Sequence, residues 1–283
     1  GVYEHYKYTK SEKFLKDNLK MCEKAIDFLK KYLKDWLNIE GTEERDKDKV
    51  QEEIENSVNR QGHKYHISYD LWEMNEGIHL YSLASIYSAF DSILNIYKAL
   101  GKNVSEFENN RLKEEKIQKN KRTIENLQTQ LKKYINENLY DEEKKSYVRN
   151  TEDRKMDISI LGAITPFNMF KPKEKKIRNT VERINMSLRT YTGGYQRFEQ
   201  DNYMNGNPWP IANLWMTLYY LETGEKKKAK ETFDFVVKTA GKHYLLGEQV
   251  DNSTLKPNWV IGLGWSHAMF IIVLEKLYKN NLK

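Results

Sequence analysis

The feature that most constrains the fold of this chain is an alternation between two kinds of helical pattern. Segments 78–100, 208–221 and 261–278 are apolar around most of the helix circumference, whereas segments 105–134 and 225–240 keep their apolar residues mostly on one face. A helix of the first kind is stable only when it is buried, and a helix of the second kind lies at a surface. The alternation therefore predicts an all-α fold in which inner and outer helices pair as hairpins around a toroid.

The remaining segments fit the same architecture. Residues 11–38 repeat apolar side chains at intervals of three and four, which predicts one long helix. Segment 41–62 is polar and is either a short helix or a surface insertion, and segment 148–164 is mixed and could contain a short helix. No stretch reaches four clean alternations of apolar and polar residues, so the sequence shows no strand pattern. We expect a single domain over residues 1–283.

Charge and composition exclude several classes of protein. The net charge is +6, but Lys and Arg alternate with Glu and Asp along helical stretches, which is typical of a solvated helix face and not of a nucleic-acid-binding stripe. No run of about 18 apolar residues exists, so we expect no membrane-spanning helix. No signal-peptide pattern is present near residue 1, and we expect a cytoplasmic location. The single cysteine, Cys22, precludes an intrachain disulfide, and no His, Cys and Asp cluster has ligand spacing, so neither a metal nor another cofactor is expected.

A first candidate site is the dipeptide Trp72–Glu73, which precedes the predicted helix 78–100. A carboxyl group beside an indole in a partly dry pocket can act as a general acid, and the ring can cover a sugar. The alternative is an ordinary acidic residue favoured by a helix N-terminus. The dipeptide alone does not separate these two interpretations.

A second candidate site is the tract 193–210, which mixes Arg, carboxylate, amide and aromatic side chains. Arg197, Glu199 and Asp201 alternate, so on an extended loop they would point to one side. Trp209 follows a turn a few residues later. These residue types suit the hydroxyl groups and ring faces of a carbohydrate, but a structural loop held by ion pairs fits them equally well.

A third candidate site is segment 247–251, which follows an amphipathic helix and carries Glu248. On a loop at the mouth of an inner helix, this carboxylate could orient a water molecule. Trp265 and His267 lie at the start of the next apolar helix, and a single histidine there is more typical of a structural hydrogen bond than of catalysis. Cleavage of a glycosidic bond requires two carboxylates that converge on one pocket, and Glu73 and Glu248 are the candidates.

Together these segments resemble the glucoamylase family of glycoside hydrolases, which includes glucodextranases and trehalases. The resemblance covers roughly residues 68–277. Two weaker resemblances to the same family lie at 157–159 and 179–181. The four ordered motifs that carry the resemblance are residues 70–73 with 77–82, 197–201 with 205–209, 247–251, and 263–268.

This resemblance implies an (α/α)6 barrel and an exo-acting, inverting hydrolysis of an α-glucan or α-glucoside oligosaccharide, with no metal or cofactor. It implies Glu73 as the general acid and Glu248 as the catalytic base. It also implies a sugar pocket built from arginine, aspartate and tryptophan side chains. The substrate-binding positions that it implies are Trp72, Arg197, Asp201, Trp209 and Trp265.

Two departures from the family pattern matter. Many relatives follow the general acid with a second acidic residue, and here Met74 stands at that position, which weakens hydroxyl binding near the leaving group. Relatives also carry an Arg-Asp pair and several helices ahead of the Trp-Glu motif, whereas only about one long helix precedes Trp72. We therefore expect the C-terminal part of a catalytic domain or a shortened member, which pairs with a missing N-terminal segment or self-associates. The competing hypothesis is a non-catalytic glucoamylase-like module that binds sugar or a protein.

Overall fold

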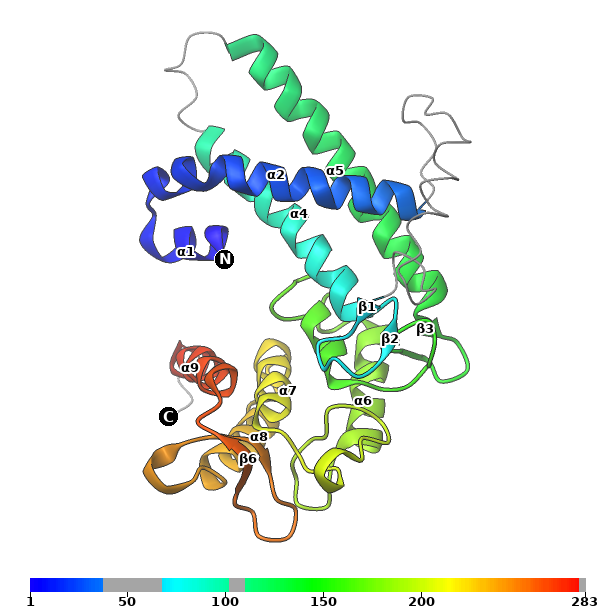
Figure 1. Ribbon diagram of the computed structural model, residues 1–283, viewed down its shortest axis with the longest axis vertical. Helices are drawn as coiled ribbons and strands as arrows, with labels where there is room; N and C mark the ends of the chain where they lie inside the picture. Colours follow the sequence, from blue (N-terminus) through cyan, green and yellow to red (C-terminus); the bar gives the residue numbers. More distant parts are fainter. Residues whose placement is uncertain (38–67, 102–109, 280–283) are drawn as a thin grey trace, which may run out of the picture.

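The computed structural model describes residues 1–37, 68–101 and 110–279, so the polar segment 41–62 lies outside the described residues. Within these ranges the chain is mainly helical, as predicted (Figure 1). The α-helices are α1 (Val2–Thr9), α2 (Glu12–Leu37), α4 (Leu80–Gly101), α5 (Asn110–Asn138), α6 (Lys175–Leu188), α7 (Pro210–Thr223), α8 (Lys226–Lys238) and α9 (Gly264–Lys279). Short 3-10 helices lie at η2 (Ile158–Ala163), η3 (Tyr203–Asn205) and η4 (Lys242–Tyr244).

Two-stranded antiparallel ribbons stand between the helices, although the sequence shows no strand pattern. These strands have two to five residues each, which is too short for an alternation to be recognised. Two of the ribbons, β1–β2 and β5–β6, carry candidate site residues. The pairs are β1 (Ser68–Tyr69) with β2 (Glu76–Gly77), β3 (Tyr140–Asp141) with β4 (Ser146–Tyr147), and β5 (Gly247–Val250) with β6 (Pro257–Ile261).

Helix α7 is the centre of the core. All of its residues from Pro210 to Tyr220 are buried, and it packs against α8, α9 and η2. The neighbouring helix α8 buries only Ala229, Thr232 and Val236. The predicted pairing of an inner with an outer helix is therefore confirmed for this hairpin.

Helix α7 begins two residues later than its sequence predicts. Asn207 followed by Pro208 is a favourable N-cap and first helical residue. In the structure, Trp209 is the N-cap and Pro210 is the first helical residue. Either proline satisfies the local rule, and Asn207 is not available as a cap because its side chain bonds elsewhere, as described below.

Helices α4 and α5 form a second pair, and α2 packs against both. The buried side chains of α4 come from several sides of the helix, whereas α5 buries one stripe. The buried residues are Leu80, Leu83, Ala84, Phe90, Ile93 and Ile96 on α4, and Ile124, Leu127, Leu131 and Ile135 on α5.

Helix α9 is less buried than its composition predicts. Val273 and Leu277 face the core, but Ile271 is 66%, Leu274 48% and Tyr278 71% exposed. An apolar pattern around most of the circumference predicts burial on every side. That prediction is wrong for α9, because α7 covers one side of the helix, with Phe233 of α8 stacked on Phe270, and no described element covers the apolar side chains on the other. We call Ile271, Ile272, Leu274 and Tyr278 the exposed α9 face.

Figure 1 shows α1, α2, α4 and α5 in one half of the molecule and α6 to α9 in the other, with the β1–β2 ribbon between them. The two halves join through η2, which packs against both α4 and α7. They also meet where the Tyr8 hydroxyl of α1 donates a hydrogen bond to Glu275 of α9 at 3.1 Å. Among the described residues, no helix is long and apolar enough to cross a membrane.

Candidate active site

Four tryptophans from three separate parts of the sequence form one aromatic cluster. The ring centroid of Trp72 lies 5.6 Å from that of Trp209, 5.7 Å from Trp265 and 5.9 Å from Trp215. Trp72, Trp209 and Trp265 come from three different sequence motifs, so the structure brings these motifs together. Trp215 lies on α7, and the sequence alone does not distinguish it from the other core residues of this apolar helix.

Glu73 lies at the tip of the β1–β2 ribbon and not in the first turn of a helix. Asp70 organises this turn: Oδ1 accepts hydrogen bonds from the backbone N–H groups of Trp72 (2.8 Å) and Met74 (3.3 Å), and Oδ2 accepts one from the Asn75 side chain (3.0 Å). Glu73 has φ +55°, which is uncommon for a residue with a side chain. The Glu73 side chain is exposed, so the described residues do not form the partly dry pocket that we expected around it.

Arg197 and Asp201 form a bidentate ion pair, with Nε–Oδ2 at 2.8 Å and Nη2–Oδ1 at 2.9 Å. Both residues are buried, at 4% exposure each. The guanidinium group lies over the Trp209 ring at 4.6 Å and near the Trp72 ring at 5.7 Å. Because both Asp201 oxygens bond to Arg197, the first role of this carboxylate is to hold the guanidinium group against the tryptophan cluster.

The tract around this ion pair is a turn and not the extended loop that its alternation predicts. Gln200 has φ +65°, and a backbone hydrogen bond of 3.1 Å closes the turn at Asp201. The Glu199 carboxylate accepts a hydrogen bond from the Met156 backbone N–H at 3.2 Å. Glu199 therefore supports the loop and does not join the Arg197–Asp201 pair.

Asn207 links the Arg197 tract to the ribbon that carries Glu248. Its amide nitrogen donates to Gln249 Oε1, and its Oδ1 accepts from the Asn252 backbone N–H, both at 3.2 Å. The backbone adds a hydrogen bond of 2.8 Å from Val250 N–H to the Pro208 carbonyl. Asn207 and Gln249 are buried, so these bonds are shielded from competing water.

Glu248 lies at an irregularity in the β5–β6 ribbon. Gly247 and Gln249, two residues apart on β5, pair with Ile261 and Asn258, three residues apart on β6. Two residues of β6 therefore stand opposite Glu248, which is a β-bulge. Bulges redirect side chains and are frequent beside active sites. The sequence predicts a loop here, because one irregular strand of four residues leaves no periodic pattern.

The carboxyl group of Glu248 is partly withdrawn from water. Its Oε2 is buried and has no hydrogen-bond partner among the described residues. Burial raises the pKa of Glu248 above its ordinary value, and the positive charge of Arg197 partly offsets this rise. A carboxylate with a free acceptor oxygen in such surroundings can accept a proton from a bound molecule.

Several buried donors of the tryptophan cluster and of strand β5 also lack partners among the described residues. They are Trp209 Nε1, Trp265 Nε1 and Gln249 Nε2. Buried polar atoms are normally hydrogen-bonded, so these unpartnered donors, together with the unpartnered Glu248 oxygen, suit a ligand rich in hydroxyl groups. His267 differs, because both of its ring nitrogens pair with backbone groups, which confirms its structural interpretation.

Asp157 belongs to this site, although its sequence context shows only a weak resemblance to the family. The Trp72 indole N–H lies 3.2 Å from Asp157 Oδ1 and 3.1 Å from Oδ2, and the Ser159 backbone N–H donates to Oδ1 at 2.7 Å. Asp157 is 1% exposed, and this burial raises its pKa to about 6. A carboxylate directly before the apolar residues 158–164 was the available signal, because such a group must find partners when it is buried.

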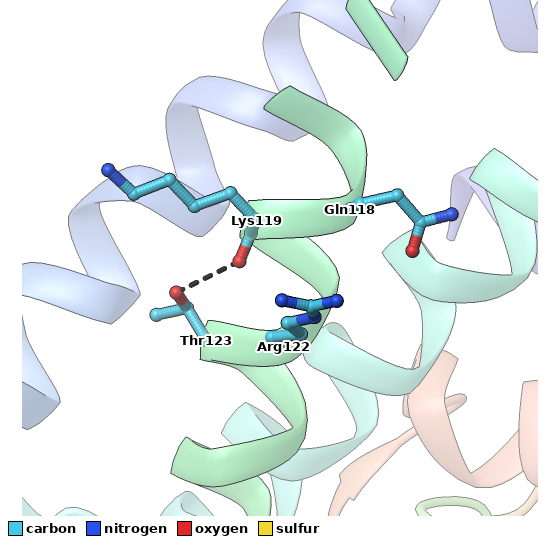
Figure 2. Close-up of a pocket in the computed structure, with 4 residues that line it drawn as sticks. All are labelled: Gln118, Lys119, Arg122 and Thr123. Atoms are coloured by element: carbon cyan, nitrogen blue, oxygen red, sulfur yellow. Dashed lines mark hydrogen bonds between the residues drawn. The ribbon is translucent and has the colours of Figure 1, made fainter. Parts of the chain in front are cut away.

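A separate hollow lies on α5, away from these residues. Gln118, Lys119, Arg122 and Thr123 line it, and the Thr123 hydroxyl donates to the Lys119 carbonyl at 3.1 Å (Figure 2). This described lining contains neither a carboxylate nor an aromatic ring. The hollow therefore lacks the groups that glycoside cleavage needs.

Comparison with known proteins gives one family and several relatives. Residues 24–245 match the profile of glycosyl hydrolases family 15. A protein of Methanocaldococcus jannaschii, described as an uncharacterized glycosyl hydrolase, is 30% identical over 226 residues, which are 75% of this chain and 34% of that protein. Trehalase 1 of Sulfolobus acidocaldarius is 26% identical over 134 residues, which are 47% of this chain and 24% of that protein.

A bacterial glucoamylase solved in complex with acarbose has a similar fold. The TM-score is 0.56 at 18% identity, and the match covers 83% of this chain and 40% of that chain. At this identity the likeness concerns the fold, and it supports the helical toroid. The chain spans 34% and 24% of the lengths of the two curated relatives.

Proposed function

Because the chain belongs to glycosyl hydrolases family 15, we propose that it is an inverting, exo-acting α-glucoside hydrolase or the larger C-terminal portion of one. Its substrate is an α-linked glucose oligosaccharide or trehalose. The observation that carries the proposal is the convergence of Trp72, Arg197, Trp209 and Glu248 around buried polar atoms that lack partners among the described residues.

In this proposal the glycosidic bond breaks in a single displacement. Glu73 donates a proton to the glycosidic oxygen, and Glu248 removes a proton from a water molecule that attacks the opposite face of the sugar. The buried, unpartnered Oε2 of Glu248 supports its role as the base. The strained backbone of Glu73 also supports a functional role, because such conformations cluster at active sites.

The sugar itself would lie against the tryptophan cluster. Trp72, Trp209 and Trp265 offer ring faces, and the indole N–H groups of Trp209 and Trp265 are free among the described residues to meet hydroxyl groups. Arg197, held by Asp201, would donate to a hydroxyl in surroundings shielded from water.

The exposed α9 face supports a further part of the proposal. Ile271, Leu274 and Tyr278 recur at intervals of three and four, as on a helix face that packs against another helix. Apolar patches of this kind are normally covered by a partner. We propose that additional helices of the same barrel cover it, since the bacterial glucoamylase is longer and this chain covers 40% of it. The same helices would enclose Glu73, whose side chain is exposed.

Glucose release from maltose and trehalose tests the activity. NMR of the first product tests the stereochemistry, because an inverting enzyme releases β-glucose from an α-glucoside. We expect low turnover from the purified chain, together with self-association in light scattering. A monomer with ordinary turnover would show that the site is complete without further helices.

The second candidate function is a non-catalytic module that binds sugar or a protein. The exposed Glu73 side chain is the observation that favours it. Such a module would bind maltose or acarbose in calorimetry but release no glucose, even when it is expressed together with the helices that complete the barrel.

A further inference from the structure

We infer that Asp157 is a positioning residue that fixes the Trp72 ring relative to Arg197. This inference rests on the proposed function. The segment 156–158 contacts both sides of the site. Its backbone pairs with the Arg197 tract, and the Asp157 side chain bonds to Trp72. Asp157 itself would not touch the sugar.

The backbone contacts fix the Arg197 side. Asp157 forms a β-bridge with Phe198, and two hydrogen bonds flank this bridge. Ile158 N–H donates to the Arg197 carbonyl at 2.8 Å, and Glu199 N–H donates to the Met156 carbonyl at 2.9 Å. The residue that bears the guanidinium group is therefore joined directly to the segment that bears the Asp157 carboxylate.

The side-chain contacts fix the Trp72 side. The indole N–H lies within 3.2 Å of both Asp157 oxygens. The Ser159 N–H holds Oδ1 at 2.7 Å, as an N-cap of η2, so the carboxylate cannot rotate without losing this bond. Because a planar indole is fixed by its stacking plane and one N–H direction, this bond sets how the Trp72 ring meets Trp209 and Trp265.

The stability of the fold alone does not explain why a carboxylate stands at position 157. Among the described residues, its hydrogen-bond donors are the neutral groups of Trp72 and Ser159. A buried carboxylate without a cationic partner is costly to ionise. A neutral side chain of the same size would fill the space at lower cost, so the benefit lies in two acceptor oxygens that hold the indole N–H and the η2 N-terminus together.

The decisive variant is Asp157→Asn. The amide oxygen can still cap η2 through Ser159 and lie near the Trp72 N–H, but the amide nitrogen replaces the second acceptor and opposes the same N–H, donor against donor. Asp141→Asn is the control, because Asp141 also accepts backbone N–H bonds, from Glu143 at 3.1 Å and Lys144 at 2.9 Å, and pairs with Arg154 at 3.3 Å, without contacting a tryptophan. Trp72→Phe removes the indole N–H while it keeps an aromatic ring.

The first readout is the circular dichroism of the coupled indoles, which depends on their mutual orientation and needs no ligand. We expect Asp157→Asn to reduce this signal while the helical signal is unchanged, and Asp141→Asn to leave both as in the wild type. In the Trp72→Phe background, Asp157→Asn should add no further change. An unchanged indole signal in Asp157→Asn, or a full additional change in the double variant, would overturn the inference.

The second readout is calorimetric binding of acarbose. We expect Asp157→Asn to weaken binding about tenfold and to be non-additive with Trp72→Phe. Equal losses in Asp157→Asn and Asp141→Asn would overturn the inference, since they would indicate a general effect of charge. If the wild-type chain binds no acarbose while the indole signal behaves as expected, the proposed function fails and the positioning of Trp72 by Asp157 stands.

Discussion

Arg197 and Asp201 stand four residues apart and bond to each other through two nitrogens and two oxygens, at 2.8 and 2.9 Å, with both side chains buried. The turn at Gln200 makes this geometry possible, because an extended backbone would separate the two groups. An arginine held in this way has little side-chain freedom left to lose, so under the proposed function the pair would be ordered before a sugar binds.

Replacing Asp201 by alanine should lower the free energy of unfolding by about 3–5 kcal/mol, because Arg197 would remain buried without its counter-ion. Urea denaturation followed by circular dichroism measures this. The double variant Arg197→Met, Asp201→Leu should recover most of the stability, since it buries no charge, but should lose sugar binding. Wild-type affinity in that double variant would contradict a substrate role for Arg197.

Glu73→Gln and Glu248→Gln should each lower kcat by about a hundredfold or more with little change in sugar affinity, because each removes one proton-transfer group. Glu125→Gln is the control, since Glu125 is an exposed residue of α5. A crystal structure with bound sugar should place the two carboxyl groups about 6.5–9.5 Å apart. A separation near 5 Å would indicate a retaining mechanism instead.

The acidic limb of the profile of kcat/KM against pH should lie above pH 4.5. Glu248 must be ionised to act as a base, so activity falls as the pH drops through its pKa, which burial raises from 4.5. Because the Arg197 charge lowers this pKa, Arg197→Met should move the limb to higher pH. If the acidic limb does not move in that variant, the Arg197 charge does not influence the titration of Glu248, and the prediction is wrong.

The stability of the protein should decline between about pH 4 and pH 6 through Asp157. Burial, with a smaller contribution from the Asp70 charge, raises the pKa of Asp157 from 3.8 to about 6 in the folded state. The folded state therefore binds more protons than the unfolded state in this window, and the free energy of unfolding falls by about 3 kcal/mol as the pH rises. Asp157→Asn should flatten this slope in denaturation curves collected at each pH, whereas Asp141→Asn should leave it in place.

Ile271→Ala and Val273→Ala compare two sides of α9. Val273 is fully buried, so its truncation should cost about 1.5–3 kcal/mol. Ile271 is 66% exposed, so its truncation should change the free energy of unfolding by no more than about 0.5 kcal/mol. Equal losses in thermal denaturation would mean that a second copy already covers the exposed α9 face in solution.

Helix periodicity was enough to predict α4, α5, α7 and α8 and the pairing of inner with outer helices. Periodicity was not enough for α9. An apolar pattern predicts that a helix is buried, but it does not show which neighbouring element covers it. The strands could not be predicted either. Gly247–Val250 has no alternating pattern, and it is stabilised by its partner strand and by Asn207.

The residues of the candidate site also fall into those that the sequence predicts and those that it does not. The motifs around Trp72, Arg197, Trp209 and Glu248 were visible as residue types that favour carbohydrate, and the structure places them together. The local sequence predicts Asn207 as a helix cap, because it satisfies the capping rule, but the partner of its side chain is Gln249, 42 residues away. The role of Asp157 is not predictable from its local sequence for a similar reason, since its partner Trp72 lies 85 residues away.

The bond between Asn207 and Gln249 has an evolutionary consequence. It joins the loop that carries the arginine to the strand that carries the candidate base, so neither can drift in position without disturbing the other. A substitution that shifts one of these two segments should therefore be accompanied by a compensating substitution in the other. The β1–β2 turn is tied to the same unit, because Trp72 bonds to Asp157 and contacts Trp209 and Trp265.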